Sequence, residues 1–447
     1  MSLRVVDHGL QYTDDHRVFF VSPLRTPLCN ARLYSEAEAA MNRQLLLCLS
    51  RAGTCMGTMA FAGALPVLRA AWHMDAATAG SIQSAFNLSN ALALLVTAWL
   101  SDSLGAKRVY LTSMWAGAVA LMLFAIFARS PHSALLLIVL VGLTQGGAYA
   151  PALLLIADLS PTAGRGRAMG QILAAASLGY LLSVFLSMWA ASAYGAAAGF
   201  GICAVGALMG AVFGQIGLIG VENRQHRSAR AATSARIEWR RVFGPASLCL
   251  LIGYVAHCWE LLGSWAWTPT LLATALRPCG FGAMTTSLIV ACTIHLSGMI
   301  ATGVVGALSD RCGRARVLIC VGAVGALCSM LIGWSEQWGT RWVVALGAVG
   351  SFFILADSGV LSAAMTEEIP AAYLGRVMGV RSILGFGIGA FAPMTFGATL
   401  DWTHQWGWAY MPLAAGGLVA SVAALALQKN GQSATVGAGG SSTSIAR

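Results

Sequence analysis

The chain has 447 residues, of which 57% are hydrophobic and only 10% are charged. A soluble domain carries roughly a quarter charged residues, because its surface must be hydrated. The composition therefore excludes an ordinary soluble protein and predicts a polytopic membrane protein. A bilayer span needs about 20 apolar residues, so twelve spans would take about 240 residues and leave room for short loops and two tails.

The net charge of +10 does not indicate nucleic-acid binding, because an excess of Lys and Arg is expected in the cytoplasmic loops of a membrane protein. The eleven cysteines are scattered, mostly within apolar runs, with no CxxC and no paired Cys–His spacing. This pattern supports neither a disulfide framework nor a metal site. We expect no cofactor and no metal.

The first 41 residues differ from the rest of the chain. They contain five acidic residues and no apolar segment of the kind that a secretory signal requires. Because Met41 stands directly before the first apolar run, residues 1–40 are either a loose cytoplasmic tail or precede the true start. The other tail, 429–447, is rich in Gly, Ser, Thr and Ala, and we expect it to be disordered.

Apolar runs predict six spans within residues 42–220 and six within 244–428, joined by a polar cytoplasmic linker at 221–243. The expected spans are 45–68, 78–100, 108–128, 135–157, 168–190, 197–219, 246–269, 284–307, 316–334, 342–364, 376–399 and 408–427.

Basic residues predict the orientation. With the N-terminus inside, fifteen Lys and Arg fall on the cytoplasmic side, nine in loops (Arg376 and Arg381 among them) and six in the linker. Only four arginines fall in the opposite loops. This asymmetry predicts that both termini are cytoplasmic.

The two halves share a repeat. The segment 100–109 (LSDSLGAKRV) recurs at 308–317 (LSDRCGRARV), 208 residues later. The segment 158–170, which ends in GRAMG, recurs at 367–379, which ends in GRVMG, 209 residues later. Two motif pairs at nearly one offset, in equivalent loops, predict parallel six-span halves, an arrangement that many secondary transporters use.

With these loops, the chain resembles the major facilitator superfamily over residues 42–428. The family's loop motif between spans two and three has the form G-x-x-x-D-R-x-G-R-R. The second-half copy, from Gly306 to Arg316, is nearly complete, whereas the first copy has Ala98 for the leading Gly and Ser103 for the Arg. The resemblance implies an all-α membrane protein with twelve transmembrane helices in two six-helix bundles.

In this family, such loops are implied to hold the cytoplasmic side shut while the protein is open to the outside. The glycines supply a turn, and the aspartate can accept from helix N-terminal amides or a neighbouring Arg. We expect Asp158 to pair with Arg165 or Arg167, and Glu367 with Arg376; the alternative is loop charges without a gating role. The expected gating residues are Asp102, Gly105, Arg108, Asp158, Arg167, Asp310, Gly313, Arg314, Glu367 and Arg376.

Within the superfamily, the stretch Tyr254–Trp267 resembles poorly characterised bacterial members grouped with nitrate/nitrite and cyanate permeases. The Gly/Asn-rich signature of nitrate porters is missing from spans five and eleven, and span five lacks the G-x8-G-x3-G-P pattern of proton-coupled drug antiporters. In the same stretch, Trp259 is a candidate for the pathway, and we expect Trp265 and Trp267 to belong to an interfacial aromatic belt.

Ionisable groups at membrane depth are costly, so each is a candidate for function. Glu260 lies about fifteen residues into span seven, about 22 Å along the helix, with His257 one turn earlier on the same face. Burial disfavours the charged form of both, which suits a proton carrier. We expect Glu260 and His257 to couple transport to protons; the alternative is a fixed bond from Glu260 to a Trp or backbone group.

Arg51 lies about two turns into span one, deeper than a headgroup anchor. A guanidinium there could bind a carboxylate bidentately, or it could snorkel inward or pair with Asp357 in span ten. We expect Asp357 to be structural or part of a gate. His295, midway through span eight, is expected to be a hydrogen-bonded helix contact.

Uncharged polar residues follow one face of span two, because Gln83, Asn87 and Asn90 are spaced i, i+4 and i+7. Gln145 and Tyr149 form a similar pair in span four. A polar stripe on a membrane helix is expected to face a wet cavity. The expected substrate-binding residues are Arg51, Gln83, Asn87, Asn90, Gln145 and Tyr149.

The expected function is secondary active transport by alternating access, with protons and a small anionic metabolite as the species moved. The chain is expected to be a monomer in the bacterial inner membrane, to bind no nucleic acid and not to be an enzyme. Import is slightly favoured over export. One alternative is proton-driven efflux of a hydrophobic compound or drug, in which Arg51 would be structural. A distant alternative is a membrane transceptor or sensor, although the linker is too short for a folded output domain.

Overall fold

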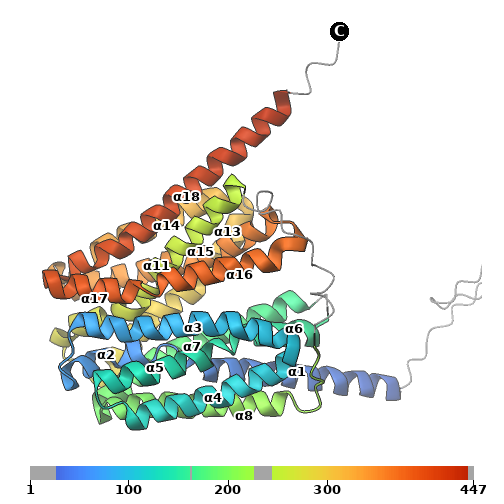
Figure 1. Ribbon diagram of the computed structural model, residues 1–447, viewed down its shortest axis with the longest axis horizontal. Coiled ribbons are helices and arrows are strands. Elements are labelled where there is room, and N and C mark those ends of the chain that lie inside the picture. The colour runs from blue at the N-terminus through green and yellow to red at the C-terminus, as the bar shows by residue number, and fades with distance from the viewer. Residues whose placement is uncertain (1–26, 162–163, 226–243, 441–447) are drawn as a thin grey trace, which may run out of the picture.

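The computed structural model of the chain describes residues 27–161, 164–225 and 244–440, with side chains from residue 41 to 430 except at 371, 372, 375 and 376. These residues form helices and no strand (Figure 1). The helices of the first half are α1 (Pro27–Cys55), α2 (Ala60–Ala71), α3 (Ala76–Leu104), α4 (Ala106–Phe127), α5 (Pro131–Gly146), α6 (Tyr149–Leu159), α7 (Arg165–Tyr194) and α8 (Ala196–Gly217).

The second half begins with α11 (Pro245–Leu276), the short turn η1 (Arg277–Cys279), α12 (Ala283–Ala291) and a π-helical turn, η2 (Cys292–Leu296). It continues with α13 (Ser297–Cys312), α14 (Arg314–Ile332), η3 (Ser335–Trp338), α15 (Thr340–Glu368), α16 (Ala371–Gly389), α17 (Ala392–Thr403) and α18 (Trp406–Gly440).

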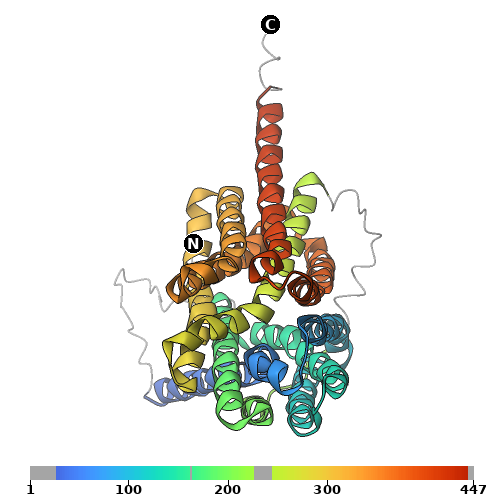
Figure 2. The same ribbon diagram turned by 90° about the vertical axis from the view of Figure 1, so that its left-hand side faces the viewer.

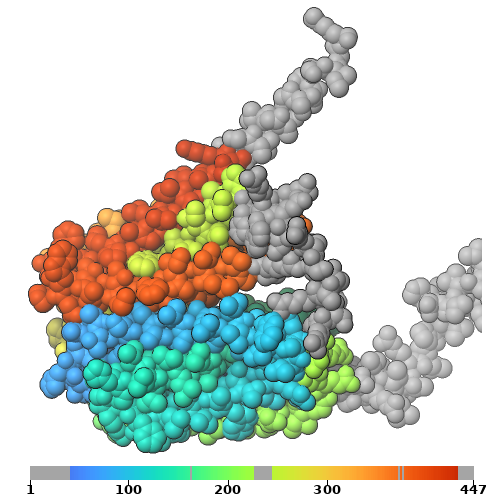
Figure 3. Space-filling view, in the orientation of Figure 1, coloured from blue at the N-terminus to red at the C-terminus, as the bar shows by residue number. Residues whose placement is uncertain are grey.

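Within the described residues, these elements make twelve stretches that are long and apolar enough to cross a bilayer, from Met41–Ala71 to Trp406–Asn430. Each coincides with one predicted span, so the prediction of twelve spans is confirmed. The helices of the first half lie together, and those of the second half lie beside them as a second bundle (Figures 1 and 3).

Small residues allow close packing within each bundle. A Cβ on Gly53 of α1 would overlap the backbone of Gly206 and Gly210 of α8. In the second bundle, a Cβ on Gly389 would overlap the carbonyl of Cys258 in α11. Small side chains at such crossings let membrane helices approach closely, because lipid provides no hydrophobic force to drive them together.

The molecule has two opposite faces, at the two ends of the helix bundles, that matter for function. The linker face is the end where α8 finishes and α11 begins; the far face, at the opposite end, carries the α2–α3 and α17–α18 connections (Figure 1). Helices α1 and α18 extend beyond the bundle, over 27–41 and 429–440. That the two tails, 1–41 and 429–447, are loose or disordered outside these helical parts stays a prediction.

Several transmembrane helices are interrupted near their middle. Residues 56–59 separate α1 from α2, residues 147–148 separate α5 from α6, and α12 passes into α13 through η2. At the first break, Ser183 of α7 donates a hydrogen bond to the freed carbonyl of Met56. A membrane helix tolerates such breaks only where other groups satisfy the backbone or where the break lines a cavity.

The two halves meet closely at the far face, which Figure 2 views end-on. Both carboxylate oxygens of Asp401 in α17 accept hydrogen bonds at the N-terminus of α3, from Ala76 N at 2.9 Å and Ala77 N at 2.6 Å. A Cβ on Gly80 would overlap the carbonyl of Pro393, and one on Gly397 would overlap that of Ala76. The close backbone approach at these two glycines and the hydrogen bonds to Asp401 together hold the two halves against each other at this face.

Candidate substrate and proton site

Arg51 lies in the last turn of α1, just before the break that leads to α2. Its side chain is buried, with an exposed fraction of 5%, and its Cζ lies 5.4 Å from the centre of the Tyr149 ring. Among the described residues it has no carboxylate partner. The alternative that Arg51 pairs with Asp357 is wrong, because Asp357 lies against His257 instead.

Tyr149 begins α6, at the break in the fourth span, and is 40% exposed although it lies deep in that span. Its electrostatic neighbours come from both bundles: Arg51 from the first, Arg381 and Tyr254 from the second. Tyr149 is therefore a partly exposed ring with electrostatic neighbours in both halves. Two of the predicted substrate-binding residues, Arg51 and Tyr149, are brought together.

Arg381, in α16, was expected to be a cytoplasmic loop residue, and this expectation is wrong. The side chain is 3% exposed, and its Cζ lies 3.6 Å from the centre of the Tyr254 ring. Its Nη2 donates to Ser362 Oγ at 3.0 Å. The sequence contained a signal for this, because Arg381 lies five residues into the predicted span 376–399. A position inside a span is the same reason for which Arg51 was singled out.

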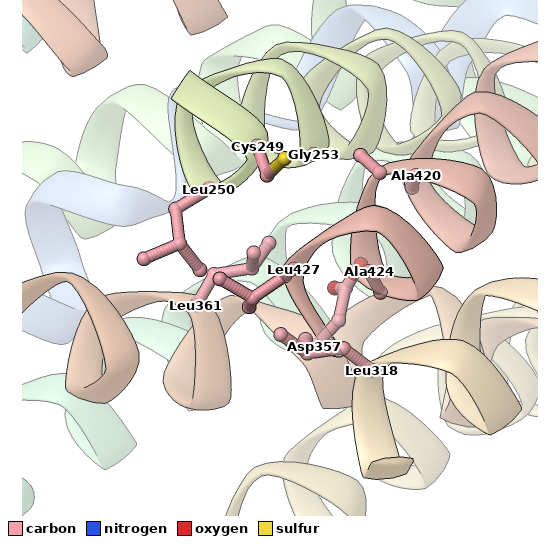
Figure 4. Close-up of a pocket in the computed structure, with 10 residues that line it drawn as sticks. Cys249, Leu250, Gly253, Leu318, Asp357, Leu361, Ala420, Ala424 and Leu427 are labelled. Carbon is pink, nitrogen blue, oxygen red and sulfur yellow. The ribbon is translucent and has the colours of Figure 1, made fainter. Parts of the chain in front are cut away.

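His257 of α11 lies against Asp357 of α15, with 2.6 Å between Nδ1 and Oδ1 and both side chains almost fully buried. The distance is that of an ion pair, although the ring N–H is not aligned for a good hydrogen bond. Asp357 also lines a pocket of about 10 Å³ within the second bundle, beside Leu318 and Leu427 (Figure 4). A cavity of that size holds about one water molecule.

Glu260 lies one turn further along α11 and accepts a hydrogen bond from Ser329 Oγ of α14 at 2.7 Å. A Cβ on Gly417 of α18 would overlap its carboxylate, so the group faces α14 and α18 inside the second bundle. Its hydrogen-bond partner is a hydroxyl, not the Trp or backbone group of the alternative. Asp357 lies within electrostatic reach of Glu260, so the two carboxylates and His257 form one titratable cluster.

The polar stripe of span two is buried rather than fully wetted. Gln83 Nε2 donates to Asn87 Oδ1 at 3.4 Å, and both side chains are less than 9% exposed, whereas Asn90 is half-buried. Among the described residues, Gln83 Oε1, Asn87 Nδ2 and Gln145 Nε2 have no hydrogen-bond partner. These groups therefore keep unused donors and an acceptor that a bound molecule or water can satisfy.

Aromatic rings connect the two halves nearby. The Tyr180 ring of α7 lies 5.3 Å from that of Trp265 in α11, and Trp265 lies 5.7 Å from the His295 ring in η2. His295 was expected to be hydrogen-bonded, but its contacts are with rings and its Nε2 has no partner among the described residues. Trp265 thus contacts the other bundle and not only the membrane interface.

Two other tryptophans have fixed indole partners. Trp267 is fully buried, stacks on Phe396 and donates to Pro393 O at 2.9 Å. Its expected place in an interfacial belt is wrong, because this part of α11 packs against α17 rather than lipid. Trp259 donates to Pro412 O at 2.9 Å, which ties α11 to α18 and gives it a structural contact.

The repeated loops on the linker face share one backbone feature. Gly105 and Gly313 both have positive φ, 88° and 91°, a conformation that favours glycine. In the second loop, Arg314 lies 2.5 Å from Asp310 and 2.8 Å from Glu367. Glu367 thus binds Arg314, which begins α14 between the ends of α13 and α15. The expected Glu367–Arg376 pair falls on a side chain outside the described residues and stays a prediction.

The first loop contacts the start of the linker. Asn223 Nδ2 donates to Leu104 O at 2.7 Å, its Oδ1 accepts from Arg108 N at 3.2 Å, and Lys107 Nζ donates to Val221 O at 2.8 Å. Asp102 and Asp158 also have interaction partners, and Arg167 is exposed. Asn223, which no sequence motif singled out, thus joins the end of α3 to the start of α4, and we call these contacts the Asn223 clasp.

A separate hollow of about 560 Å³ lies toward the far face, between α2 and α7 of the first half and α11 and α12 of the second. Small and apolar side chains line most of it, including Pro66, Met188 and Ala273, and Arg277 stands at its edge. In the described residues, no group of three or more His, Cys, Asp or Glu is placed to hold a metal ion.

Twelve apolar helices in two bundles, with buried charges between and within them, define a multi-pass membrane protein of the transporter type. The sequence profile of the Major Facilitator Superfamily matches residues 47–303, more than half of the chain. The chain belongs to the major facilitator superfamily and is a membrane transporter of that kind.

Individual relatives agree with this assignment. Over 126 residues the chain is 31% identical to the uncharacterized MFS-type transporter YfiU of Bacillus subtilis (strain 168), a match that covers 27% of this chain and 23% of that protein. The chain thus spans under a quarter of that relative's length. The likeness to nitrate/nitrite and cyanate permeases stays a prediction.

Solved transporter structures share the fold. A bacterial homologue of the human lysosomal transporter Spinster, in an inward-facing and unoccupied conformation, has a TM-score of 0.70 at 14% identity, covering 87% of this chain and 96% of that one. The nucleoside transporter NupG has a TM-score of 0.63 at 17% identity, with 87% and 99% covered. The POT family transporter PepTSo has a TM-score of 0.66 at 15% identity, with 88% and 98% covered. At these identities the likeness shows the fold alone.

Proposed function

We propose that this protein moves a small anionic metabolite together with protons across the bacterial inner membrane by alternating access. The observation that carries the proposal is the buried guanidinium of Arg51, which has no carboxylate partner among the described residues and lies beside Tyr149. Tyr149 is partly exposed and has electrostatic neighbours in both bundles, which supports a substrate site beside Arg51.

An unpaired charge at membrane depth is costly, and such residues usually line a substrate or ion pathway. An anion that enters beside Arg51 would supply the missing counter-charge, and the guanidinium fork matches a carboxylate with two parallel hydrogen bonds. The unused polar atoms of Gln83, Asn87 and Gln145 offer neutral hydrogen bonds to the rest of the molecule.

The proton-coupling group in this proposal is the cluster in the second bundle. His257 and Glu260 carry protons, and Asp357 stabilises the protonated imidazole at 2.6 Å. Histidine is the side chain that proteins most often use to bind and release protons. Because all three groups lie on α11 and α15, proton binding acts directly on the half that contains Arg381.

The linker face is the cytoplasmic face in this scheme, since the basic loop residues gather there. Backbone contacts between Gly80, Gly397 and their partners close the far face, which supports an arrangement open toward the cytoplasm. The loops that carry the Arg314 ion pairs and the Asn223 clasp then close the cytoplasmic side in the state that is open to the outside. The protein works as a monomer.

Uptake into proteoliposomes tests the proposal. Labelled organic anions are offered with and without an inward proton gradient to the wild type, to Arg51→Gln, and to Arg129→Gln, which removes an exposed loop charge. We expect gradient-dependent uptake in the wild type and the loop variant, and a loss of about tenfold or more in Arg51→Gln. Undiminished uptake in Arg51→Gln would show that Arg51 does not bind the anion, and absence of anion uptake by the wild type would favour efflux of a hydrophobic compound.

A further inference from the structure

Two buried guanidiniums, one from each bundle, lie around Tyr149. Arg51 approaches from α1 and Arg381 from α16, with exposed fractions of 5% and 3%. Both are within electrostatic reach of the Tyr149 side chain. The proposed function assigns a role to the first guanidinium only.

The described neighbours of Arg381 do not neutralise it. It donates to the hydroxyl of Ser362, contacts the sulfur of Met378 and stacks on the Tyr254 ring, and its Nε has no partner. These contacts are uncharged. Asp357 is the nearby carboxylate, and its Oδ1 is already 2.6 Å from His257.

When His257 is protonated, it and Asp357 cancel each other, and both arginines are left without a counter-charge. A buried cation that lacks a counter-ion is strongly unfavourable unless a bound group supplies one. Two such cations, one buried in each bundle, require two negative charges. A substrate with a single carboxylate would leave one guanidinium uncompensated.

We propose that the substrate is a small dicarboxylate, one carboxylate held by Arg51 and the other by Arg381, so that Arg381 determines specificity for two charges. This inference rests on the proposed function and names its substrate class. Because α1 and α16 belong to different bundles, a dicarboxylate bound to both arginines links the halves directly. A monocarboxylate can bind only one half, and therefore favours closure around the site less.

Matched pairs of ligands test the inference on the purified full-length protein. Binding of succinate and glutarate is compared with that of their monomethyl esters, which have nearly the same size but one charge, for the wild type, Arg381→Gln, Arg51→Gln and the loop control Arg129→Gln. We expect the wild type to bind at least one diacid about 10- to 100-fold more tightly than its ester, the range for hydrogen bonds to a charged group.

In Arg381→Gln we expect the diacid to bind about as weakly as the ester, with the ester affinity changed by less than about threefold. Should Arg381→Gln fail to fold, Arg381→Lys takes its place, because lysine keeps the positive charge but lacks the two parallel N–H donors of the guanidinium. We expect Arg381→Lys to retain a smaller preference for the diacid. Arg129→Gln should behave as the wild type.

Equal wild-type affinities for a diacid and its ester, or an equal loss of both in Arg381→Gln, would overturn the dicarboxylate assignment and leave anion transport through Arg51 standing. Unchanged binding of every acid in Arg51→Gln would overturn the proposed function itself. If the wild type binds none of these anions, both proposals fail.

Discussion

The Nδ1 atom of His257 in α11 lies 2.6 Å from Oδ1 of Asp357 in α15, which comes 100 residues later in the chain. Both side chains are almost fully buried in the second bundle, and Glu260 lies one turn away, bonded to Ser329. Arg381 is within electrostatic reach of Asp357. A proton that binds this cluster therefore changes the electrostatic field at Arg381.

The His257–Asp357 pair is expected to couple proton and substrate movement. Asp357→Asn removes the group that stabilises the proton on His257, and His257→Gln removes the group that carries it. In both variants gradient-driven uptake should fall about tenfold or more, while substrate exchange without a gradient persists. Proteoliposome uptake and counterflow measure the two activities separately. The exposed His132→Gln is the control, and gradient-driven uptake of wild-type size in Asp357→Asn would refute the role of the pair.

Two variants distinguish the role of Glu260 from that of Ser329, its hydrogen-bond donor. Glu260→Gln keeps the shape and still accepts from Ser329, so stability should stay near that of the wild type while gradient-driven uptake is lost and exchange is kept. Ser329→Ala leaves the buried carboxylate without that donor, which should cost about 1–3 kcal/mol and lower the melting temperature. Normal gradient-driven uptake in a stable Glu260→Gln protein would show that Glu260 does not carry the coupled proton and that its hydrogen bond with Ser329 is structural.

Asp401 is expected to stabilise the closed far face. Its carboxylate accepts from the N-terminal amides of α3, which belongs to the other half, whereas Asp75 caps the same helix from within its own half through Thr78 N at 2.7 Å. Asp401→Ala should shift the protein toward the state open at the far face. The loss of about 1–3 kcal/mol corresponds to a population shift of roughly 5- to 150-fold.

Spin labels at positions 71 and 405, on the two halves at the far face, measure this shift as a distance distribution. Asp75→Ala removes a cap of the same kind without breaking a contact between halves, so it should lower helix stability and leave the distances as in the wild type. If Asp75→Ala and Asp401→Ala shift the distances equally, the bridge between halves has no special effect.

The close approach of α3 and α17 gives a steric test of the same closure. A methyl group at Gly80 would overlap the carbonyl of Pro393, which belongs to the backbone and cannot move aside cheaply. Gly80→Ala should therefore hinder closure and lower the transport rate about tenfold or more. Gly303→Ala, where nothing lies within 4 Å of the added methyl group, is the control and should transport normally. Equal rates for the two variants would contradict the steric argument.

The sequence by itself determined the twelve spans, their grouping into two related halves and the turn at Gly105 and Gly313. These features depend on local composition, on the length of apolar runs and on glycine's tolerance of positive φ, none of which needs a distant partner. The depth of Arg51, Glu260 and His257 in the membrane was predictable for the same reason.

Only the tertiary structure decided which side chains meet. It placed Arg381 beside Tyr254 rather than in a loop, gave His257 the carboxylate of Asp357, and brought Asp401 to Ala76, 325 residues away in the chain. These contacts depend on how each helix is rotated and how closely it packs against its neighbours. An apolar run shows that a helix crosses the membrane, but in a span that is apolar on every side it does not show which face meets which helix.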